Sequence, residues 1–308
     1  MDVIFDMETG DPDDLITLLM LINNPDVNLK AVTCYQGSPI QIGLINHVLN
    51  LAGLNNSILV GGLNSIEPME LSPYYTETVG MWKPAHATMS PVEVFENTFA
   101  AYPDIHVLTG APLTNLGLVL DQLPNLRIKN MTTQGGYIGD LVEPSKKLKK
   151  FLNKPNQRTY NLGNDVEAFT KVNFSDNIDK LTFVTKDLCH GFVYTAEIHK
   201  NINFANNPIA NLLQKCLEKY ALAGKNKAMH DPLAMLIMLY PELGITAQVN
   251  MNYHINDKSH PVFSSQLGEG FTNALTDYKK DNTWNKFISI CQDNTLNNNL
   301  HKTKNKLK

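Results

Sequence analysis

The sequence is poor in cysteine and has no excess of charge of one sign, and each shortage excludes a class of protein. Its 308 residues include only four cysteines, and no two of them form a CxxC pair. Neither a disulfide framework nor a thiolate zinc site is therefore expected. With 30 acidic and 26 basic residues the net charge is -4, which offers no electrostatic attraction for nucleic acid or for an anionic membrane. The expected partner is a small molecule.

The sequence also lacks long apolar runs. None approaches the roughly 18 residues that a membrane span requires. The first residues, Met-Asp-Val-Ile-Phe-Asp, contain neither the basic region nor the apolar stretch of a signal peptide. These two features predict an enzyme of the cytoplasm.

Short β-branched segments alternate with helical patterns along most of the chain, which predicts an α/β fold. We expect a single domain over residues 1–292, with a mostly parallel, open central sheet flanked by helices. The strands are predicted at residues 3–5, 31–34, 57–60, 105–108, 131–133, 181–184 and 245–255. The helices are predicted at residues 14–22, 42–51, 91–101, from 112 onward, 208–220, 232–240 and 284–291. Residues 293–308 are rich in Asn and Lys, have little to bury, and are predicted to be disordered.

Polar or glycine-rich segments follow several of these predicted strands. They lie at residues 6–14, 36–38, 109–110, 134–136 and 187–190. In open parallel sheets, ligands bind beyond the carboxyl ends of the strands. Residues that are distant in the sequence are therefore predicted to line one cleft, and His190 is either part of that cleft or a structural histidine.

The first of these segments is an acidic loop. It carries five carboxylates in nine residues: Asp6, Glu8, Asp11, Asp13 and Asp14. Strand alternation places Asp6 and Glu8 on the same side. A helix N-terminus favours each carboxylate by about 0.3–1 kcal/mol, so Asp13 or Asp14 could simply cap the helix. Several carboxylates in one loop nevertheless repel each other unless a cation is present, and such hard oxygen ligands select Ca²⁺ or Mg²⁺.

A second acidic element, His230-Asp231-Pro232, begins an apolar helix far downstream. Taken alone, it is typical of an Asp cap followed by proline in the first helical turn. Its functional interpretation depends on the other motifs of the chain.

Four separated segments together resemble the inosine–uridine nucleoside hydrolase family. Residues 6–14, Asp-Met-Glu-Thr-Gly-Asp-Pro-Asp-Asp, are similar to the family's D-x-D-P-G-x-D-D. Residues 106–115 resemble A-T-G-P-L-T-N, residues 133–136 stand in the place of M-G-G, and residues 229–232 match V-H-D-P. The order and spacing agree over nearly the whole chain. The resemblance implies a Rossmann-like open sheet with the active site at the strand carboxyl ends.

The resemblance also implies a metal-dependent hydrolysis of the N-glycosidic bond of a ribonucleoside, giving free base and ribose. One Ca²⁺ ion would be held by Glu8, Asp14, the main-chain carbonyl of Thr109 and Asp231. Asp6 and Asp11 would lie beside this ion. Family members are commonly homodimers or homotetramers, so the resemblance implies an oligomer.

The catalytic roles implied by the resemblance fit the chemistry. Glu8 would activate the attacking water, and His230 would help to protonate the departing base. The reaction passes through an oxocarbenium-like state, and a cation orients both water and sugar. The residues expected to contact the substrate are Asp13, Ser38, Gln134, Thr159 and Asn161.

This chain departs from the family pattern at several positions. Glu8 replaces an Asp, which moves the carboxylate by about 1.5 Å, and the loop has one extra residue, Asp11 or Pro12. Asp11 is therefore an alternative general base. Ser38 replaces an Asn that contacts the sugar, and Thr159 replaces a Glu that binds the 5′ end of the ribose, so a 5′-altered nucleoside is a plausible substrate. Residues 140–158 are Lys-rich and diverge from the family.

Two other functions are compatible with parts of the sequence. The departures from the pattern could belong to a protein that binds nucleosides or ribosides without turnover. The start of the acidic loop also resembles a Mg²⁺-dependent phosphatase with Asp6 as nucleophile, although the later Lys and acidic pair of such enzymes are not recognisable. Candidates for stacking on a base, although residues of this kind are more often packing residues, are Tyr74, Tyr75, Trp82, His86, Tyr160 and Phe271.

Overall fold

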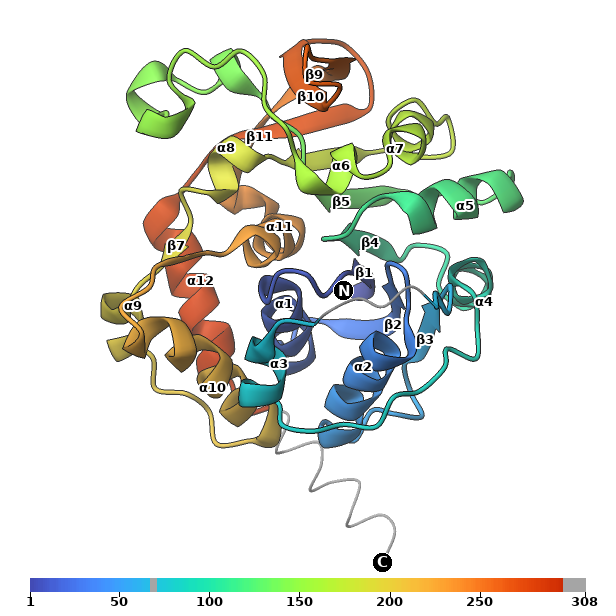
Figure 1. Ribbon diagram of the computed structural model, residues 1–308, viewed down its shortest axis with the longest axis vertical. Coiled ribbons are helices and arrows are strands. Elements are labelled where there is room, and N and C mark those ends of the chain that lie inside the picture. The colour runs from blue at the N-terminus through green and yellow to red at the C-terminus, as the bar shows by residue number, and fades with distance from the viewer. Residues whose placement is uncertain (67–70, 296–308) are drawn as a thin grey trace, which may run out of the picture.

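The computed structural model describes residues 1–66 and 71–295 (Figure 1). Within them the chain forms one α/β domain around a nine-stranded sheet, and this confirms the predicted fold class. Most of the segment predicted to be disordered, residues 296–308, lies outside the described residues. None of the described helices combines the length and apolar character that crossing a bilayer requires.

The sheet has the strand order β10-β9-β11-β6-β5-β4-β1-β2-β3. Parallel pairing joins neighbouring strands from β3 across to β11, whereas β9 and β10 are antiparallel. The parallel strands are β1 (Asp2–Met7), β2 (Asn28–Cys34), β3 (Leu59–Gly62), β4 (His106–Thr109), β5 (Asn130–Gln134), β6 (Leu181–Val184) and β11 (Thr272–Tyr278). The antiparallel strands are β9 (Gly244–Ile255) and β10 (Pro261–Leu267).

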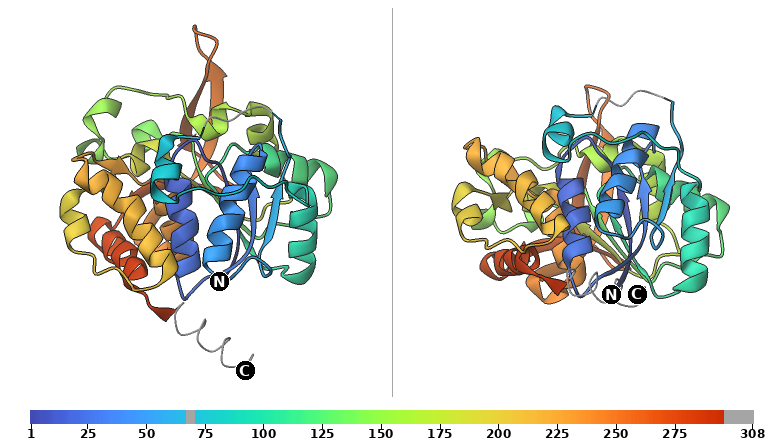
Figure 2. Two further views of the ribbon diagram at one scale, coloured as in Figure 1. Left: turned by 60° about the horizontal axis from the view of Figure 1, so that its bottom comes forward. Right: turned by 90° about the horizontal axis from the view of Figure 1, so that it is seen from below.

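Helices cover both faces of the sheet (Figures 1 and 2). One layer contains α1 (Asp13–Asn23), α10 (Pro208–Leu222), α11 (His230–Leu239) and α12 (Lys280–Gln292), which contact one another. On the other face, α4 (Pro91–Ala101), α5 (Thr114–Gln122) and α7 (Val166–Asn173) pack in series. The remaining helices are α2 (Pro39–Leu51), α3 (Pro73–Thr78), α6 (Tyr160–Gly163), α8 (Lys186–Cys189) and α9 (Ala196–Lys200). A short ribbon pairs β7 (Val193–Tyr194) with β8 (Lys227–Ala228).

The buried character of the first strand and helix follows from this layering. On β1, Val3, Ile4, Phe5 and Met7 are fully buried, because a parallel strand covered on both faces has no solvent side. Helix α1 is apolar around most of its circumference and every one of its residues is buried, since it packs against the sheet and against α10 and α11.

Several elements differ from the sequence-based expectation. The strand predicted at residues 57–60 begins two residues later, as β3. Helix α5 begins at Thr114 rather than at Pro112. Strands β10 and β11 were not predicted, because their segments have weak alternation and are held by pairing with β9 and β6.

This topology brings several loops to one edge of the sheet. Strands β1, β4, β5 and β6 are parallel neighbours, so their carboxyl ends lie together. The N-termini of α1 and α11 reach the same place, because the two helices pack against each other. The predicted convergence of distant segments is therefore present.

Candidate active site

A pocket of about 390 Å³ lies at this edge of the sheet. It is lined by acidic residues from the loop after β1 and from α11, and by polar and basic residues that follow β5 and β6. The lining residues are Glu8, Gly10, Asp11, Asp13, Asp14, Gly110, Gln134, Thr159, Tyr160, Asn161, Lys186, Cys189, His190, His230 and Asp231. Most of the site residues predicted from the sequence are thus brought together.

The loop after β1 is folded around Glu8. The backbone amides of Gly10 and Asp11 both donate to its carboxylate, and the amide of Glu8 donates to Asp14 Oδ1 at 2.9 Å. Burial raises the pKa of Glu8, although the amide hydrogen bonds oppose the shift. The extra residue in the loop is thus accommodated by a turn that the longer Glu side chain stabilises.

Asp13 joins this loop to the start of α11. Its Oδ2 accepts hydrogen bonds from the amides of His230 at 2.7 Å and Asp231 at 3.2 Å, and its Oδ1 accepts from Lys227 Nζ at 3.0 Å. Burial opposes ionisation of Asp13, but Lys227 and His230 outweigh it and hold the pKa well below its usual range. Asp13 therefore caps α11 rather than its own helix, where no side-chain cap is formed.

Asp14 and Asp231 form the centre of the acidic group. Both are buried, and together with Asp13 they offer oxygens that lie within 4.8 Å of one another. Gly110 lies directly against them, since a Cβ at this position would meet Asp231 Cγ at 2.7 Å and Asp14 Oδ1 at 3.0 Å. Burial and mutual repulsion raise the pKa values of Asp14 and Asp231 well above the usual range.

These carboxylates fit a hard divalent cation. Asp231 Oδ1 is buried without a hydrogen-bond partner in the described part of the chain. The ion pairs formed there by Lys227 involve Asp11 and Asp13, not Asp14 or Asp231. Two buried carboxylates side by side are unfavourable without positive charge, and carboxylate oxygens are the ligands that Ca²⁺ prefers. The buried group of three carboxylates whose oxygens lie within 4.8 Å of one another contains Asp13 rather than the predicted Glu8.

Asp6 and Thr109 lie behind this group. Asp6 is fully buried and accepts hydrogen bonds from Thr33 Oγ1 at 2.7 Å, Asn115 Nδ2 at 2.8 Å and Thr109 Oγ1 at 3.2 Å. Burial raises the pKa of Asp6 to about 6, against the effect of these hydrogen bonds. Asp6 is thus occupied in joining β1, β2 and the segment after β4.

The predicted substrate contacts divide into two groups. Thr159, Asn161 and Gln134 line the pocket, where Asn161 Nδ2 donates to Gln134 Oε1 at 2.8 Å and to the Gly110 carbonyl at 2.7 Å. Ser38 is not among the described residues that line the pocket. Its hydroxyl instead donates to Gln41 Oε1 at 2.9 Å at the start of α2.

Two histidines lie side by side in the pocket. The ring centroids of His190 and His230 are 4.9 Å apart, and the ring planes are inclined at 65° in an edge-to-face arrangement. His230 Nδ1 lies 3.5 Å from Asp13 Oδ2, and its Nε2 is buried without a hydrogen-bond partner among the described residues. Burial lowers the pKa of His230, while Asp13 opposes the shift. His230 is therefore the pocket residue best placed to offer a proton that no protein group already uses.

The aromatic residues considered for stacking on a base differ in their exposure to solvent. Tyr160 lines the pocket and is 57% exposed, so it can contact a ligand. Tyr74 and Tyr75 are buried and their hydroxyls donate to the backbone carbonyls of Cys216 and Asp11. Trp82 is also buried, with its indole N–H on the Ile40 carbonyl.

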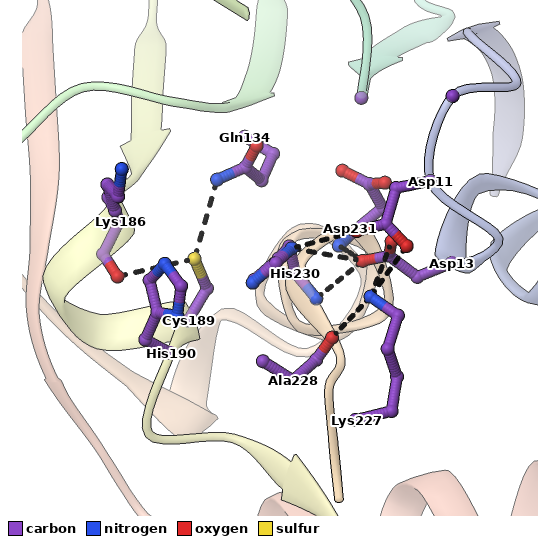
Figure 3. A network of polar contacts seen from close by, with 12 residues as sticks. Asp11, Asp13, Gln134, Lys186, Cys189, His190, Lys227, Ala228, His230 and Asp231 are labelled. Atoms are coloured by element: carbon purple, nitrogen blue, oxygen red, sulfur yellow. Dashed lines mark hydrogen bonds and ion pairs between the residues drawn. The ribbon is translucent and has the colours of Figure 1, made fainter. Parts of the chain in front are cut away.

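Sequence reasoning missed two lysines of the site. Lys227 bridges Asp11 at 2.7 Å and Asp13 at 3.0 Å (Figure 3), and Lys186 lines the opposite part of the pocket. Neither belongs to a recognisable motif. The available signal was proximity, because Lys227 stands three residues before His230 and Lys186 directly precedes Asp187 in a segment that follows a strand.

Comparisons with known proteins extend over nearly the whole chain. The family model of the inosine-uridine preferring nucleoside hydrolases matches residues 3–293. The pyrimidine-specific ribonucleoside hydrolase RihA of Citrobacter koseri is 24% identical over 274 residues, which is 80% of this chain and 82% of that protein. RihA of Escherichia coli O157:H7 is also 24% identical, with the same coverage.

Solved structures share the fold. The inosine-uridine preferring nucleoside hydrolase of Bacillus anthracis has a TM-score of 0.70 at 18% identity, covering 95% of this chain and 100% of that one. The purine-preferring ribonucleoside hydrolase of Gardnerella vaginalis has a TM-score of 0.67 at 17% identity, covering 94% and 98%. At these identities the likeness concerns the fold.

Proposed function

This chain belongs to the inosine-uridine preferring nucleoside hydrolase family and is a ribonucleoside hydrolase, and from that premise we propose how its pocket performs the reaction. The observation that carries the proposal is the buried pair Asp14 and Asp231, which forms no ion pair with a lysine or arginine among the described residues. The pair lines a pocket that also contains Glu8 and His230.

We assign the cation to one Ca²⁺ ion held by Asp14 and Asp231, with the Thr109 carbonyl and Glu8 completing the protein ligands. Carboxylate and carbonyl oxygens favour Ca²⁺ over softer metals. When bound, the cation offsets the repulsion between the carboxylates, orients the ribose hydroxyls and makes a nearby water more acidic.

The chain's own residues supply the remaining chemistry. Glu8 takes a proton from the water that attacks C1′, and the C1′–N bond breaks with its electron pair leaving on the base. His230 donates a proton to that nitrogen, and the carboxylate of Asp13 stabilises the charged imidazole. Asp13 also accepts a hydrogen bond from a ribose hydroxyl. Asn161 holds Gln134 against the wall of the pocket.

Glu8 is preferred to Asp11 as the base because of their partners. Asp11 is paired with Lys227 at 2.7 Å. Glu8 lines the pocket, and in the described part of the chain it forms no ion pair, while its carboxylate accepts from the backbone amides of Gly10 and Asp11. Replacing a general base typically lowers the rate about 10²–10⁴-fold. Glu8→Gln is therefore expected to lower kcat by about that factor, and Asp11→Asn by much less.

The test is a panel of ribonucleosides assayed for free base by chromatography. Uridine and cytidine come first, because the curated relatives carry the name pyrimidine-specific, followed by inosine and adenosine. We expect base release that EDTA abolishes and added Ca²⁺ restores. Tight nucleoside binding without base release, in protein shown to contain Ca²⁺, would instead support the binding-protein alternative.

We also propose that the protein is a homodimer or homotetramer and acts in the cytoplasm. Support for the location comes from the four cysteines, which are all free thiols, as expected in a reducing compartment. Light scattering of the purified protein tests the assembly, and cell fractionation tests the location. A monomer, or recovery outside the cytoplasmic fraction, would contradict these assignments.

A further inference from the structure

A group of positive charges lies next to the pocket, opposite the carboxylates. We call it the rim group, and it consists of Lys150, Lys154, Arg158 and Lys186. Among the described ion pairs, the neighbouring Lys146 and Lys147 are matched with Asp277 and Asp140, but no described carboxylate lies within 4.0 Å of a rim-group cation. Lys150, Lys154 and Arg158 are exposed to solvent, whereas Lys186 is half-buried and lines the pocket.

Two members of the rim group reach the pocket through direct contacts. Lys186 is itself a lining residue, and its ammonium donates to the Arg158 carbonyl at 2.8 Å. Lys150 Nζ lies 2.8 Å from Nδ1 of His190, another lining residue. Figure 3 shows Lys186 and His190 on one side of His230, with Asp13 and Lys227 on the other side. The pocket therefore has a negative side and a positive side.

The rim-group charges are held close together at an energetic disadvantage. Burial, and then repulsion from Lys150, Arg158 and Lys154, lowers the pKa of Lys186. Burial and Lys154 lower the pKa of Lys150. The nearest acidic residue in sequence, Asp187, accepts instead from the amides of Ile138 and Gly139. A bound anion would offset this repulsion, as a phosphate does when it binds to a cluster of lysine and arginine side chains.

A buried hydroxyl lies at the same place. Thr159 follows Arg158, lines the pocket and is 6% exposed. Its Oγ1 is buried and has no hydrogen-bond partner among the described residues. A buried hydroxyl left without a partner is unfavourable. Thr159 can donate to an anionic oxygen that the rim group attracts.

We propose that the physiological substrate carries a phosphate on C5′ and is a ribonucleoside 5′-monophosphate. This inference rests on the proposed function. The carboxylates and their cation take the vicinal 2′ and 3′ hydroxyls, and C1′ carries the base, so C5′ is the sugar position left to face the rim group. A phosphate monoester has a charge of about -1.5 to -2 at pH 7, which complements the positive side of the pocket.

The reaction leaves the phosphate ester intact. Water supplies the OH that forms the new C1′–O bond, the C1′–N bond breaks, and the base leaves with the electron pair and one proton. The products are free base and ribose 5-phosphate. The rim group binds and orients the substrate and takes no part in bond cleavage.

The test compares uridine with uridine 5′-monophosphate, and inosine with inosine 5′-monophosphate, through the rate of free-base release in Ca²⁺-loaded protein. We expect kcat/KM to be at least about tenfold higher for the nucleotide of each pair, because a hydrogen bond between two charged groups is worth about that factor or more. Because the attraction is electrostatic, added salt should reduce this ratio.

Variants connect the preference to the rim group. Lys186→Gln should lower the nucleotide-to-nucleoside ratio of kcat/KM about tenfold, mainly through KM, and Lys186→Arg should retain most of it. The matched control is Lys149→Gln, which removes an exposed charge from the same segment and should leave the ratio within about twofold. In calorimetry, ribose 5-phosphate should bind more tightly than ribose to the unmodified protein but not to Lys186→Gln.

The outcomes separate the two proposals. Hydrolysis of nucleosides with no preference for the nucleotides, or a preference that Lys186→Gln does not change, overturns the phosphate proposal and leaves the nucleoside hydrolase function in place. Absence of base release from every substrate, in protein that contains Ca²⁺, overturns the proposed function and the phosphate proposal that rests on it.

Discussion

Residues of the same type have different tasks within the acidic loop, and their partners decide which. Asp6 is surrounded by three hydrogen-bond donors from side chains. Asp14 accepts a hydrogen bond from the backbone amide of Glu8, and its carboxylate lies close to that of Asp231. A carboxylate already satisfied by donors contributes to structure, whereas one that faces another carboxylate requires a cation.

This difference predicts opposite sensitivities to substitution. Asp14→Ala should abolish measurable Ca²⁺ binding, because it removes a direct ligand. Asp6→Ala should weaken it only about tenfold, the usual effect of losing a residue that supports the ligands. Isothermal titration with Ca²⁺ provides the measurement. Equal Ca²⁺ affinities for Asp14→Ala and the unmodified protein would refute the ligand assignment.

His190 makes the stability of the folded protein depend on pH. Burial, with the positive charges of His230 and Lys150, lowers the pKa of His190 to about 3, while an unfolded histidine titrates near 6.5. The unfolded chain therefore binds the proton more readily. The stability associated with neutral His190 is fully present above about pH 6.5 and is lost as the pH falls toward 3.

Replacing this histidine should make the free energy of unfolding less sensitive to acidic pH. In His190→Gln the free energy of unfolding, measured by urea denaturation, should decrease less between pH 6.5 and 4 than in the unmodified protein. His86→Gln, at an exposed histidine, is the control and should leave the profile unchanged. Parallel profiles for His190→Gln and the unmodified protein would contradict this expectation.

At the scale of elements, one lysine joins the loop after β1 to the ribbon that precedes α11. Lys227 on β8 is nearly buried and contacts Asp11 and Asp13. Its ammonium also donates to the Ala228 carbonyl at 2.8 Å. Burial opposes its charge, but Asp13 and Asp11 outweigh that effect and raise the pKa of Lys227 above its usual range.

Removing this lysine should destabilise the metal-free protein. Leaving a buried charge without its partner typically costs about 3–5 kcal/mol, so Lys227→Met should lower the free energy of unfolding in EDTA by about that amount. Added Ca²⁺ should reduce the loss, because a cation held by Asp14 and Asp231 places positive charge beside Asp13, one of the two partners of Lys227. Urea denaturation with and without Ca²⁺ measures both effects.

The control for this variant is an ion pair of the surface. Lys171 contacts Asp121 at 2.6 Å and Glu167 at 3.0 Å with much of each pair exposed to solvent. Such pairs contribute about 0–1 kcal/mol, so Lys171→Met should change stability little. Equal losses for the two variants would show that Lys227 is no more than a surface charge.

At the scale of the whole molecule, negative and positive side chains lie on opposite sides of the pocket, although the net charge of the chain is small. The carboxylates gather beyond β1 and at α11, and the rim group gathers beyond β5 and β6. The sheet brings these two sides together at the carboxyl ends of its parallel strands, with the acidic side buried. Ligand binding at this edge is therefore expected to stabilise the entire domain.

Calcium should raise the melting temperature of the protein. A ligand that binds only the folded state contributes about 2.7 kcal/mol at 100 times its Kd. For a domain of this size that corresponds to a shift of about 4 °C. Differential scanning calorimetry in EDTA and in Ca²⁺ measures the shift, and Asp14→Ala, which lacks the ligand, should show none.

The sequence was sufficient for the α/β class, for the bounds of β6 and α4, and for the carboxylates of the loop after β1. These features depend on local periodicity and on residue types that act within a few positions of one another. The burial of a helix that is apolar all round, such as α1, can also be predicted from its sequence. The order of polar segments after strands predicted the edge of the sheet that carries the pocket.

Only the tertiary structure decided which distant side chains meet there. It brought Lys227, Lys186 and His190 to the pocket, directed Ser38 to the cap of α2, and made Asp13 a cap for α11. It also paired β11 between β6 and β9. These outcomes depend on contacts between segments tens to hundreds of residues apart, and local sequence patterns contain no information about such distances.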